Sequence, residues 1–376
     1  MTRKRLGALD VDAFMRRCWQ RKPLLVRGAF AGFVDPLSPA QVLAAATREE
    51  TNSRLVVRTG KKWSLEHGPI AASRLRGLPR RDWTVLVQDT NHFAPRADAL
   101  LRAFDFIPHA RIDDVMVSYA TPGGGVGPHV DSYDVFLLQG HGRRRWRISS
   151  QADHEFVPGL PLRILRRFQA QEEWVLEAGD MLYLPPGVAH EGAAETECLT
   201  WSIGFRAPSD AEVVHGFLDH LRDRLAPAGH YADPGAQRSR NPGAVPGALV
   251  SHIDKALRTI RWSAADVREF AGCFLSEPKA EVVFEPPRPA LPRARFASRI
   301  ARHGIALDAR SRLLFSGTMF FINGERVAVT PAARAMARSL ADRRALMGPL
   351  RAGDDFVELA YAWYRQGFVV PGREGP

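Results

Sequence analysis

The chain has 376 residues, 45% of them hydrophobic and 25% charged, and its formal net charge is +11. This composition is typical of a folded protein of about two to three domains, and it excludes a disordered chain and a collagen-like repeat. The positive charge favours anionic partners such as nucleic acid or the ribosome.

The sequence also indicates the cellular compartment of the protein. No uncharged apolar run is long enough to span a membrane, and the N-terminal segment turns acidic before any apolar run. Three cysteines, Cys18, Cys198 and Cys273, are far apart and form no CxxC motif. We therefore expect reduced thiols in a cytoplasmic protein that has no secretory signal and no membrane partner.

The first part of the chain, up to about Arg206, alternates short β-like runs with glycine and proline turns. Many short strands with turn signals between them predict a barrel or a double-sheet jelly roll. The clearest runs are Trp83–Asp89, Asp114–Ala120, Tyr133–Gln139, Arg144–Ser149, Asp180–Pro186 and Cys198–Phe205.

From Ser209 onward the pattern becomes helical. Ser209 is a predicted N-cap, followed by an acidic first turn that includes Glu212. Two more helical runs follow, near 249–259 and 263–275, after a loop rich in glycine and proline. These runs predict a helical region between the β-rich part and the C-terminal part.

A proline-rich segment at 277–294 is the predicted linker to the last domain, because clustered prolines resist helix and central strand alike. Beyond it, residues 311–329 predict a hairpin with Asn323-Gly324 at its turn. A helix capped by Thr330 and a second helix over 354–367 follow, which fits a winged helix. The predicted domains are 1–206, 207–278 and 279–376.

The clearest chemical motif is a histidine and an aspartate two residues apart, His129 and Asp131, in a strand pattern framed by glycine and proline. Residues i and i+2 of a strand point to the same side, so both side chains are predicted to project into one cavity. His190, which follows a Pro-Pro-Gly turn, is the predicted third ligand. Two histidines and one carboxylate form the facial triad of non-haem Fe(II) oxygenases. The alternative is a hydrogen-bonded histidine pair without a metal.

The next strand predicts a buried arginine. Arg144 shares a face with Trp146 and Ile148, whereas the other face carries arginines alone and is predicted to lie in solvent. An unpaired interior charge is costly, so Arg144 needs an anion, and its planar fork suits a carboxylate. That carboxylate could belong to an internal Asp or Glu, or to a dicarboxylate cosubstrate that chelates the metal at its other end.

Other strands are predicted to place polar side chains in the same cavity. The pattern from His129 to Gln139 reads as one strand, with Tyr133 on the face of the metal ligands and Asp134 on the opposite face. For each further candidate the alternative is ordinary strand packing or a capping role. These candidates are Thr200 and Ser202 on one strand and Asp114 and Ser118 on another.

At these residues the sequence resembles the JmjC-type, 2-oxoglutarate-dependent ribosomal oxygenases, and in particular their bacterial arginine-hydroxylase branch. The resemblance is carried by HVD at 129–131 with His190, by Arg144 two residues before Trp146, and by WQRKPLLVRGAF at 19–30. It implies a mainly β plus α protein: a double-stranded β-helix (jelly-roll, cupin-type JmjC) core, a helical dimerisation region at 207–278, and a C-terminal winged-helix domain.

The resemblance also implies an activity, hydroxylation of C3 of an arginine in large-subunit ribosomal protein L-sixteen, with 2-oxoglutarate and O2 as cosubstrates. It implies a homodimer. A contact with ribosomal RNA is expected from the positive charge. The residues that match the family's motifs imply roles: His129, Asp131 and His190 for Fe(II), Arg144, Ser118 and Thr200 for 2-oxoglutarate, and Asp114, Tyr133 and Ser202 for the substrate arginine.

Three other functions stay open at the level of sequence. One is a related oxygenase such as a ribosomal histidyl hydroxylase or a lysyl demethylase, although Asp114 and Tyr133 favour a guanidinium. Another is a cupin-like isomerase or metal-dependent hydrolase, whose sites usually carry more histidines and need no buried arginine. The third is a non-catalytic adaptor that binds the ribosome or RNA through its basic surface and winged helix.

Overall fold

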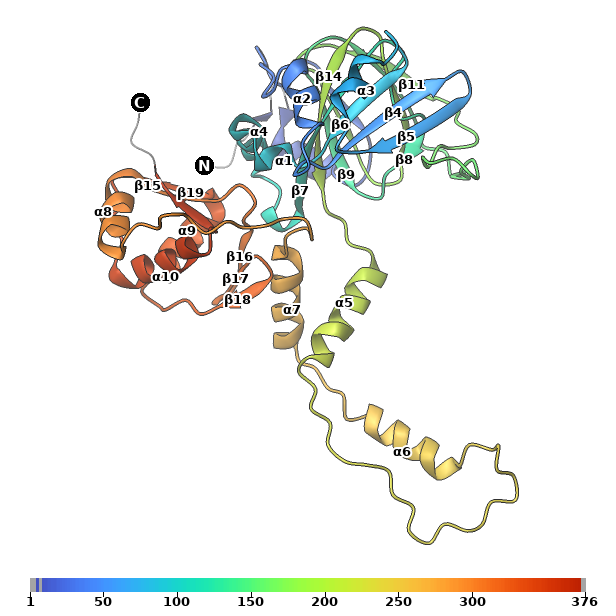
Figure 1. The fold of residues 1–376 in the computed structure, drawn as a ribbon, viewed down its shortest axis with the longest axis vertical. Coiled ribbons are helices and arrows are strands. Elements are labelled where there is room, and N and C mark those ends of the chain that lie inside the picture. Colours follow the sequence, from blue (N-terminus) through green and yellow to red (C-terminus); the bar gives the residue numbers. More distant parts are fainter. Residues whose placement is uncertain (1–4, 7–8, 373–376) are drawn as a thin grey trace. The chain divides into compact units, whose positions relative to one another are not determined.

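The computed structural model of the chain describes residues 5–6 and 9–372. It divides into two compact units, Met1–Ala207 and Pro208–Pro376. The first unit is mainly β-sheet, and the second combines helices with two small sheets (Figure 1). None of the helices within the described ranges combines the length and the apolar character needed to cross a bilayer.

The first unit is built on two antiparallel sheets. The larger has eight strands in the order β3-β12-β9-β14-β7-β6-β4-β5, and the smaller has four in the order β11-β10-β13-β8. From β7 to β14 the chain passes repeatedly from one sheet to the other, which is the winding of a double-stranded β-helix or jelly roll. The predicted fold class is therefore confirmed.

The bounds of these strands are β3 Leu24–Val26, β4 Ser53–Thr59, β5 Lys62–His67, β6 Trp83–Val87, β7 Ile112–Ala120, β8 His129–Val130, β9 Asp134–Gln139, β10 Arg144–Ser149, β11 Glu172–Leu176, β12 Met181–Leu184, β13 Ala189–Ala194 and β14 Cys198–Phe205. A two-stranded ribbon, β1 Arg5–Leu6 and β2 Leu9–Asp10, precedes them. The helices of this unit are α1 Val11–Arg17, α2 Pro39–Ala45, α3 Ala72–Arg76 and α4 Pro95–Leu101, with single 3-10 turns at Thr90–His92, Arg102–Phe104 and His109–Arg111.

The large sheet buries its two faces differently. On β14, Leu199, Trp201 and Ile203 are fully buried in an apolar core that also includes residues of α1, α2 and α4. The alternate residues, Thr200 and Ser202, point to the other face. The strand period of two thus separates a packing face from a polar face, as the sequence predicts.

The segment from His129 to Gln139 is not one strand, so this prediction is wrong. His129–Val130 forms β8 at the edge of the small sheet, and Asp134–Gln139 forms β9 inside the large sheet. The chain crosses between the sheets at residues 131–133, where aspartate and serine are common turn formers. Because of this crossing, Tyr133 lies in a connection rather than in a strand.

A buried carboxylate ties β9 to its surroundings. Asp134 is fully buried, and it accepts hydrogen bonds from the Tyr183 hydroxyl at 2.6 Å, from an Arg111 terminal nitrogen at 2.9 Å and from the Gln20 amide at 3.0 Å. Burial of the ring and, to a lesser extent, the hydrogen bond to Asp134 raise the pKa of Tyr183, so the phenol remains a donor. Through these hydrogen bonds Asp134 on β9 is linked to the turn that follows α1 and to β12.

The second unit begins with the helices α5 Asp210–Arg222, α6 Gly247–Leu257 and α7 Ala264–Ser276. Ser209 caps α5 as the sequence predicts, and Glu212 completes a capping box. Its C-terminal part contains α8 Arg293–His303, α9 Arg334–Arg343 and α10 Asp354–Arg365, with sheets of β15 Gly304–Leu307, β19 Ala345–Met347 and β20 Val369–Pro371, and of β16 Leu313–Ser316, β17 Met319–Ile322 and β18 Glu325–Val327.

Two local expectations in this unit need correction. The predicted hairpin is a three-stranded meander, because Gly317, with φ of +62°, makes a second tight turn before the turn at Asn323-Gly324. Helix α9 begins three residues later than expected, at Arg334. The Thr330 hydroxyl still accepts a hydrogen bond from the Ala333 amide, but it stabilises a turn that precedes the helix.

Replacing Asp134 with alanine tests the buried network. Removal of one partner of a buried ion pair leaves Arg111 uncompensated, so we expect the free energy of unfolding of the β-rich unit to fall by roughly 3–5 kcal/mol. The matched control is Asp82→Ala, which removes the half-exposed pair with Arg58 and should cost about 1 kcal/mol or less. Urea denaturation followed by near-ultraviolet circular dichroism measures both. Equal losses would show that the buried Asp134 network stabilises the protein no more than the Asp82 pair does.

Candidate metal centre

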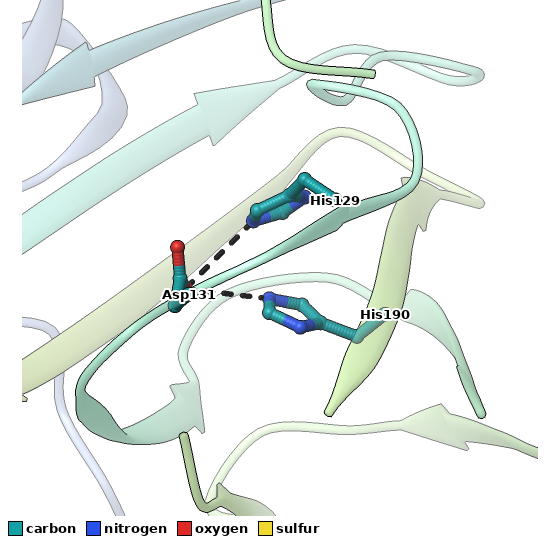
Figure 2. Close-up of side chains that lie close together, drawn as sticks. All are labelled: His129, Asp131 and His190. Atoms are coloured by element: carbon teal, nitrogen blue, oxygen red, sulfur yellow. Dashed lines mark ion pairs between the residues drawn. The ribbon is translucent and has the colours of Figure 1, made fainter. Parts of the chain in front are cut away.

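The three residues of the predicted triad meet at one point of the first unit. His129 on β8 and His190 on β13 are directly opposed in the register of the small sheet, so their side chains leave the same face. Asp131 follows two residues after His129, where the chain crosses to the large sheet. Figure 2 shows the two imidazole rings and the carboxylate pointing toward one another.

The hydrogen bonds of the two imidazoles leave one nitrogen of each free for a metal. His129 Nδ1 lies 3.0 Å from the Gly127 carbonyl oxygen, and His190 Nδ1 lies 2.9 Å from that of Val188. A carbonyl oxygen only accepts, so both Nδ1 atoms carry the proton and both Nε2 atoms present a lone pair. Backbone oxygens that fix the tautomer in this way are typical of metal-ligating histidines.

The ligand atoms are close enough to share one ion. Asp131 Oδ2 lies 3.8 Å from His129 Nε2 and 3.6 Å from His190 Nε2, and the set spans at most 4.8 Å. Two ligands of one ion are at most about 4.2 Å apart, twice a bond of about 2.1 Å, so the two measured pairs fit a shared ion. Burial and the neighbouring His129 lower the pKa of His190 to about 4, which keeps this imidazole neutral and able to ligate at pH 7.

The triad opens into a cavity of about 790 Å³. The polar face of the large sheet forms one side of the cavity lining, and residues of the segment around 154–163 form another part of it. All nine residues that the sequence singles out line this cavity: Asp114, Ser118, His129, Asp131, Tyr133, Arg144, His190, Thr200 and Ser202.

Arg144 is buried in this cavity, with 4% of its surface exposed. One terminal nitrogen donates to the Ser118 hydroxyl at 3.0 Å and to the Thr200 hydroxyl at 3.4 Å, and the other donates to the Gly192 carbonyl at 3.1 Å. The Nε atom is buried and has no hydrogen-bond partner. Gln139 in turn accepts the Thr200 hydroxyl proton at 3.0 Å.

The charge of Arg144 has no carboxylate partner within the described part of the chain. Burial lowers the pKa of its guanidinium, whereas the arginines on the outer face of β10 reach glutamates: Arg145 pairs with Glu173 and Glu195, and Arg147 pairs with Glu191. An internal acid as the partner of Arg144 is therefore excluded among the described residues. The orphaned Nε and the surrounding hydroxyls fit a ligand carboxylate.

Close packing holds the Arg144 side chain in place. The guanidinium lies 5.2 Å from the centre of the Trp146 ring, and that ring lies 6.0 Å from the imidazole of His190. Gly192 on β13 faces both, and a Cβ atom there would lie 2.7 Å from the indole and 2.8 Å from Arg144 Nε. Only glycine leaves room for the indole and the guanidinium at this point of the sheet.

Asp114 is oriented by the turn that follows β6. One of its carboxylate oxygens accepts the Asp89 amide at 3.1 Å, and the Asn91 side chain accepts the next amide along β7, that of Val115, at 2.9 Å. Tyr133 lies nearby; burial and the charges of Asp131 and Asp114 raise its pKa, so its phenol stays protonated. The cavity lining thus combines a fixed carboxylate with a hydroxyl group.

Sequence reasoning missed the wall formed by β4 and β6. Arg54 and Val56 on β4, with Thr84 and Leu86 on β6, line the same cavity. Their alternation with core residues is visible in the sequence, but the pairing of these strands beside β7 is a long-range feature that periodicity does not reveal.

Comparisons with known proteins cover nearly the whole chain. A JmjC domain family matches residues 99–213, and a ROXA-like winged-helix family matches residues 259–369. The ribosomal protein uL16 3-hydroxylase of Escherichia coli (strain K12) is 32% identical over 364 residues, which are 96% of this chain and 97% of that protein. A probable ribosomal oxygenase of Haemophilus influenzae is 38% identical over 209 residues, 54% of this chain and 52% of that protein.

Solved structures agree with this match. YcfD, a ribosomal oxygenase from E. coli, in complex with cobalt and 2-oxoglutarate has a TM-score of 0.82 to this chain at 32% identity. The match covers 97% of this chain and 99% of that one. A second structure of E. coli ycfD gives a TM-score of 0.83 over 96% of this chain and 98% of that one.

Replacing Arg144 with methionine separates stability from ligand binding. The variant removes an uncompensated buried charge, so the melting temperature of the ligand-free protein should stay equal or rise. Addition of 2-oxoglutarate to the cobalt-loaded protein should raise the melting temperature of the wild type but not of this variant, because the stabilisation follows ligand affinity. Arg147→Met, on the outer face of the same strand, is the control and should keep the shift. A variant at Arg144 that keeps the full shift would refute this role.

Proposed function

The chain belongs to the JmjC-domain family of ribosomal oxygenases, and from this premise we propose that it is an Fe(II)- and 2-oxoglutarate-dependent hydroxylase of ribosomal protein uL16. The hydroxyl group is added to C3 of an arginine of this protein, the L-sixteen of the large subunit. The observation that carries the proposal is a metal triad and an uncompensated guanidinium that line one cavity.

In this proposal His129, Asp131 and His190 would hold Fe(II). Bound Fe(II) would supply the activation of O2, the oxidant of a reaction in which one oxygen atom enters the arginine and the other enters succinate as 2-oxoglutarate loses CO2. Arg144 binds the carboxylate of 2-oxoglutarate that is distant from the metal. The hydroxyls of Ser118 and Thr200, which already contact Arg144, complete that end of the pocket.

The substrate arginine is held in the same cavity. Asp114 supplies a carboxylate that the Asp89 amide orients, and a carboxylate is the natural partner of a guanidinium. Tyr133 and Ser202 line the cavity as well and offer hydroxyls to the peptide. These side chains fix the position of one C–H bond relative to the metal, which is the contribution that the protein makes to such chemistry.

A turnover assay with a uL16 peptide tests the function. With Fe(II), 2-oxoglutarate and O2 the wild type should release succinate and add the mass of one oxygen atom to the arginine, as fragmentation mass spectrometry locates it. His129→Ala should abolish both products, and Asp114→Asn should raise the KM for peptide by about tenfold or more, because a charge-assisted hydrogen bond is lost. Oxygen on a histidine, or none on any peptide, would contradict the proposal.

We further propose a homodimer that forms through the helical region. Helix α5 exposes Val214 and Leu218, and α6 exposes Val250, Ile253 and Leu257, which recur at helical spacing. Apolar residues in such stripes are seldom left in water, and a second copy of the chain would cover them.

Light scattering on gel-filtered protein tests the dimer. The wild type should give about twice the chain mass of 41.7 kDa. The double variant Ile253→Asp, Leu257→Asp should give the single-chain mass, because charges would be buried at the interface. Val283→Asp, at an exposed apolar residue outside these helices, is the control and should remain dimeric. A wild type of 41.7 kDa would overturn the proposal.

The net charge of +11 supports a contact with ribosomal RNA, which would weaken as salt concentration rises. Helix α8 exposes Arg293, Arg295 and Arg302 and is a candidate for this contact. Action on a ribosomal protein implies a cytoplasmic location for the enzyme.

A further inference from the structure

The cavity extends past the proposed cosubstrate pocket along the large sheet. In the register of the strands Ser118 on β7 is paired with Leu86 on β6, and Leu86 is paired with Arg54 on β4. Neighbouring strands are about 4.8 Å apart, so the backbone of Arg54 lies about 10 Å from that of Ser118. Arg54 therefore occupies a part of the cavity wall beyond the groups assigned to metal and cosubstrate.

The side chain of Arg54 faces into the cavity and is without a partner there. Its neighbours Leu55 and Val57 belong to the apolar core on the opposite face of β4. The Arg54 side chain is only partly exposed, its Nε atom is buried, and the side chain makes no hydrogen bond or ion pair with any residue that the structure describes. On the same strand Arg58 differs, because it pairs with Asp82 at 2.8 Å. A partly desolvated guanidinium without an acceptor is unfavourable unless a ligand supplies one.

Two carboxylates show what kind of acceptor suits Arg54. Asp113 and Asp114 on β7 line the same cavity as Arg54. Arg54 is thus a cation in a region that already contains carboxylates. A further carboxylate from a ligand would be repelled by Asp113 and Asp114, whereas a neutral carbonyl oxygen would need only a donor.

We propose that Arg54 is a substrate-binding residue whose guanidinium donates to a main-chain carbonyl oxygen of the peptide, while Asp114 holds the substrate's own guanidinium. The inference rests on the proposed function, because it takes the ligand of this cavity to be an arginine within a polypeptide. Arg54 then binds a carbonyl oxygen and Asp114 binds a guanidinium, both in the substrate arginine or in that arginine and the residue next to it. Together the two contacts fix the direction in which the peptide enters the cavity. No hydrogen bond or ion pair joins the Arg54 side chain to the metal ligands or to Arg144 in the described structure, and in this proposal Arg54 has no part in cosubstrate binding.

Steady-state kinetics of Arg54→Ala and Arg54→Lys with the uL16 peptide test this role. For Arg54→Ala the KM for peptide should rise about tenfold or more, since a hydrogen bond from a charged donor is lost, while kcat and the KM for 2-oxoglutarate stay within about twofold. Arg54→Lys should recover part of the loss, because it keeps the charge but not the fork. Arg58→Ala is the matched control on the same strand and should leave all three constants unchanged.

A thioamide scan of the peptide locates the carbonyl. In such a scan each carbonyl oxygen of the peptide is replaced in turn by sulfur, which accepts a hydrogen bond only weakly. The wild type should bind the peptide less tightly when one particular carbonyl is replaced. The affinity of Arg54→Ala for the peptide should not change on replacement of that carbonyl. Unchanged peptide KM in Arg54→Ala, with a wild type that hydroxylates the peptide, overturns this inference and leaves the proposed function standing. A wild type that neither binds nor hydroxylates the peptide overturns both. A rise in the KM for 2-oxoglutarate would assign Arg54 to the cosubstrate and also refute the inference.

Discussion

The guanidinium of Arg144 is buried among hydroxyl and carbonyl oxygens, without a carboxylate partner in the described chain, and the cavity is organised around this uncompensated charge. A protein gains nothing in stability from such a group, because the desolvation of the charge is not repaid. The neighbouring residues hold the guanidinium rather than neutralise it: Gly192 leaves room for it, Trp146 packs against it and Ser118 orients it. The protein thus keeps one cation available for a ligand anion. The resulting loss of stability is offset when the ligand binds.

The jelly-roll winding explains why the metal triad forms near this cation. His129 and His190 are far apart in sequence but opposed in the register of β8 and β13, and the crossing to the large sheet delivers Asp131 to the same point. Arg144 belongs to β10, which pairs with β13 on its other side. The cation and the two histidines therefore lie on three neighbouring strands of the small sheet, in the order β10, β13, β8.

Much of this arrangement could be predicted from local pattern. A strand period of two correctly placed Arg144 inward and separated Thr200 and Ser202 from the core residues of β14, and all nine candidate residues line one cavity. The failures have a common cause, since tertiary pairing overrides local pattern. The alternation from His129 to Gln139 continues through a change of sheet, a glycine turn adds a third strand to the wing, and Arg54 joins the cavity only because β4 and β6 extend the large sheet.

The small sheet ends in an edge strand of only two residues. β8 is held to β13 by two residue pairs, Ala189 with Val130 and His190 with His129, and the second pair also provides two ligands of the triad. An ion bound there would act as a crosslink across the weakest seam of the β-helix. Metal occupancy and order of the 127–133 segment would then be thermodynamically linked, so that a bound ion would also stabilise the loop that carries Tyr133.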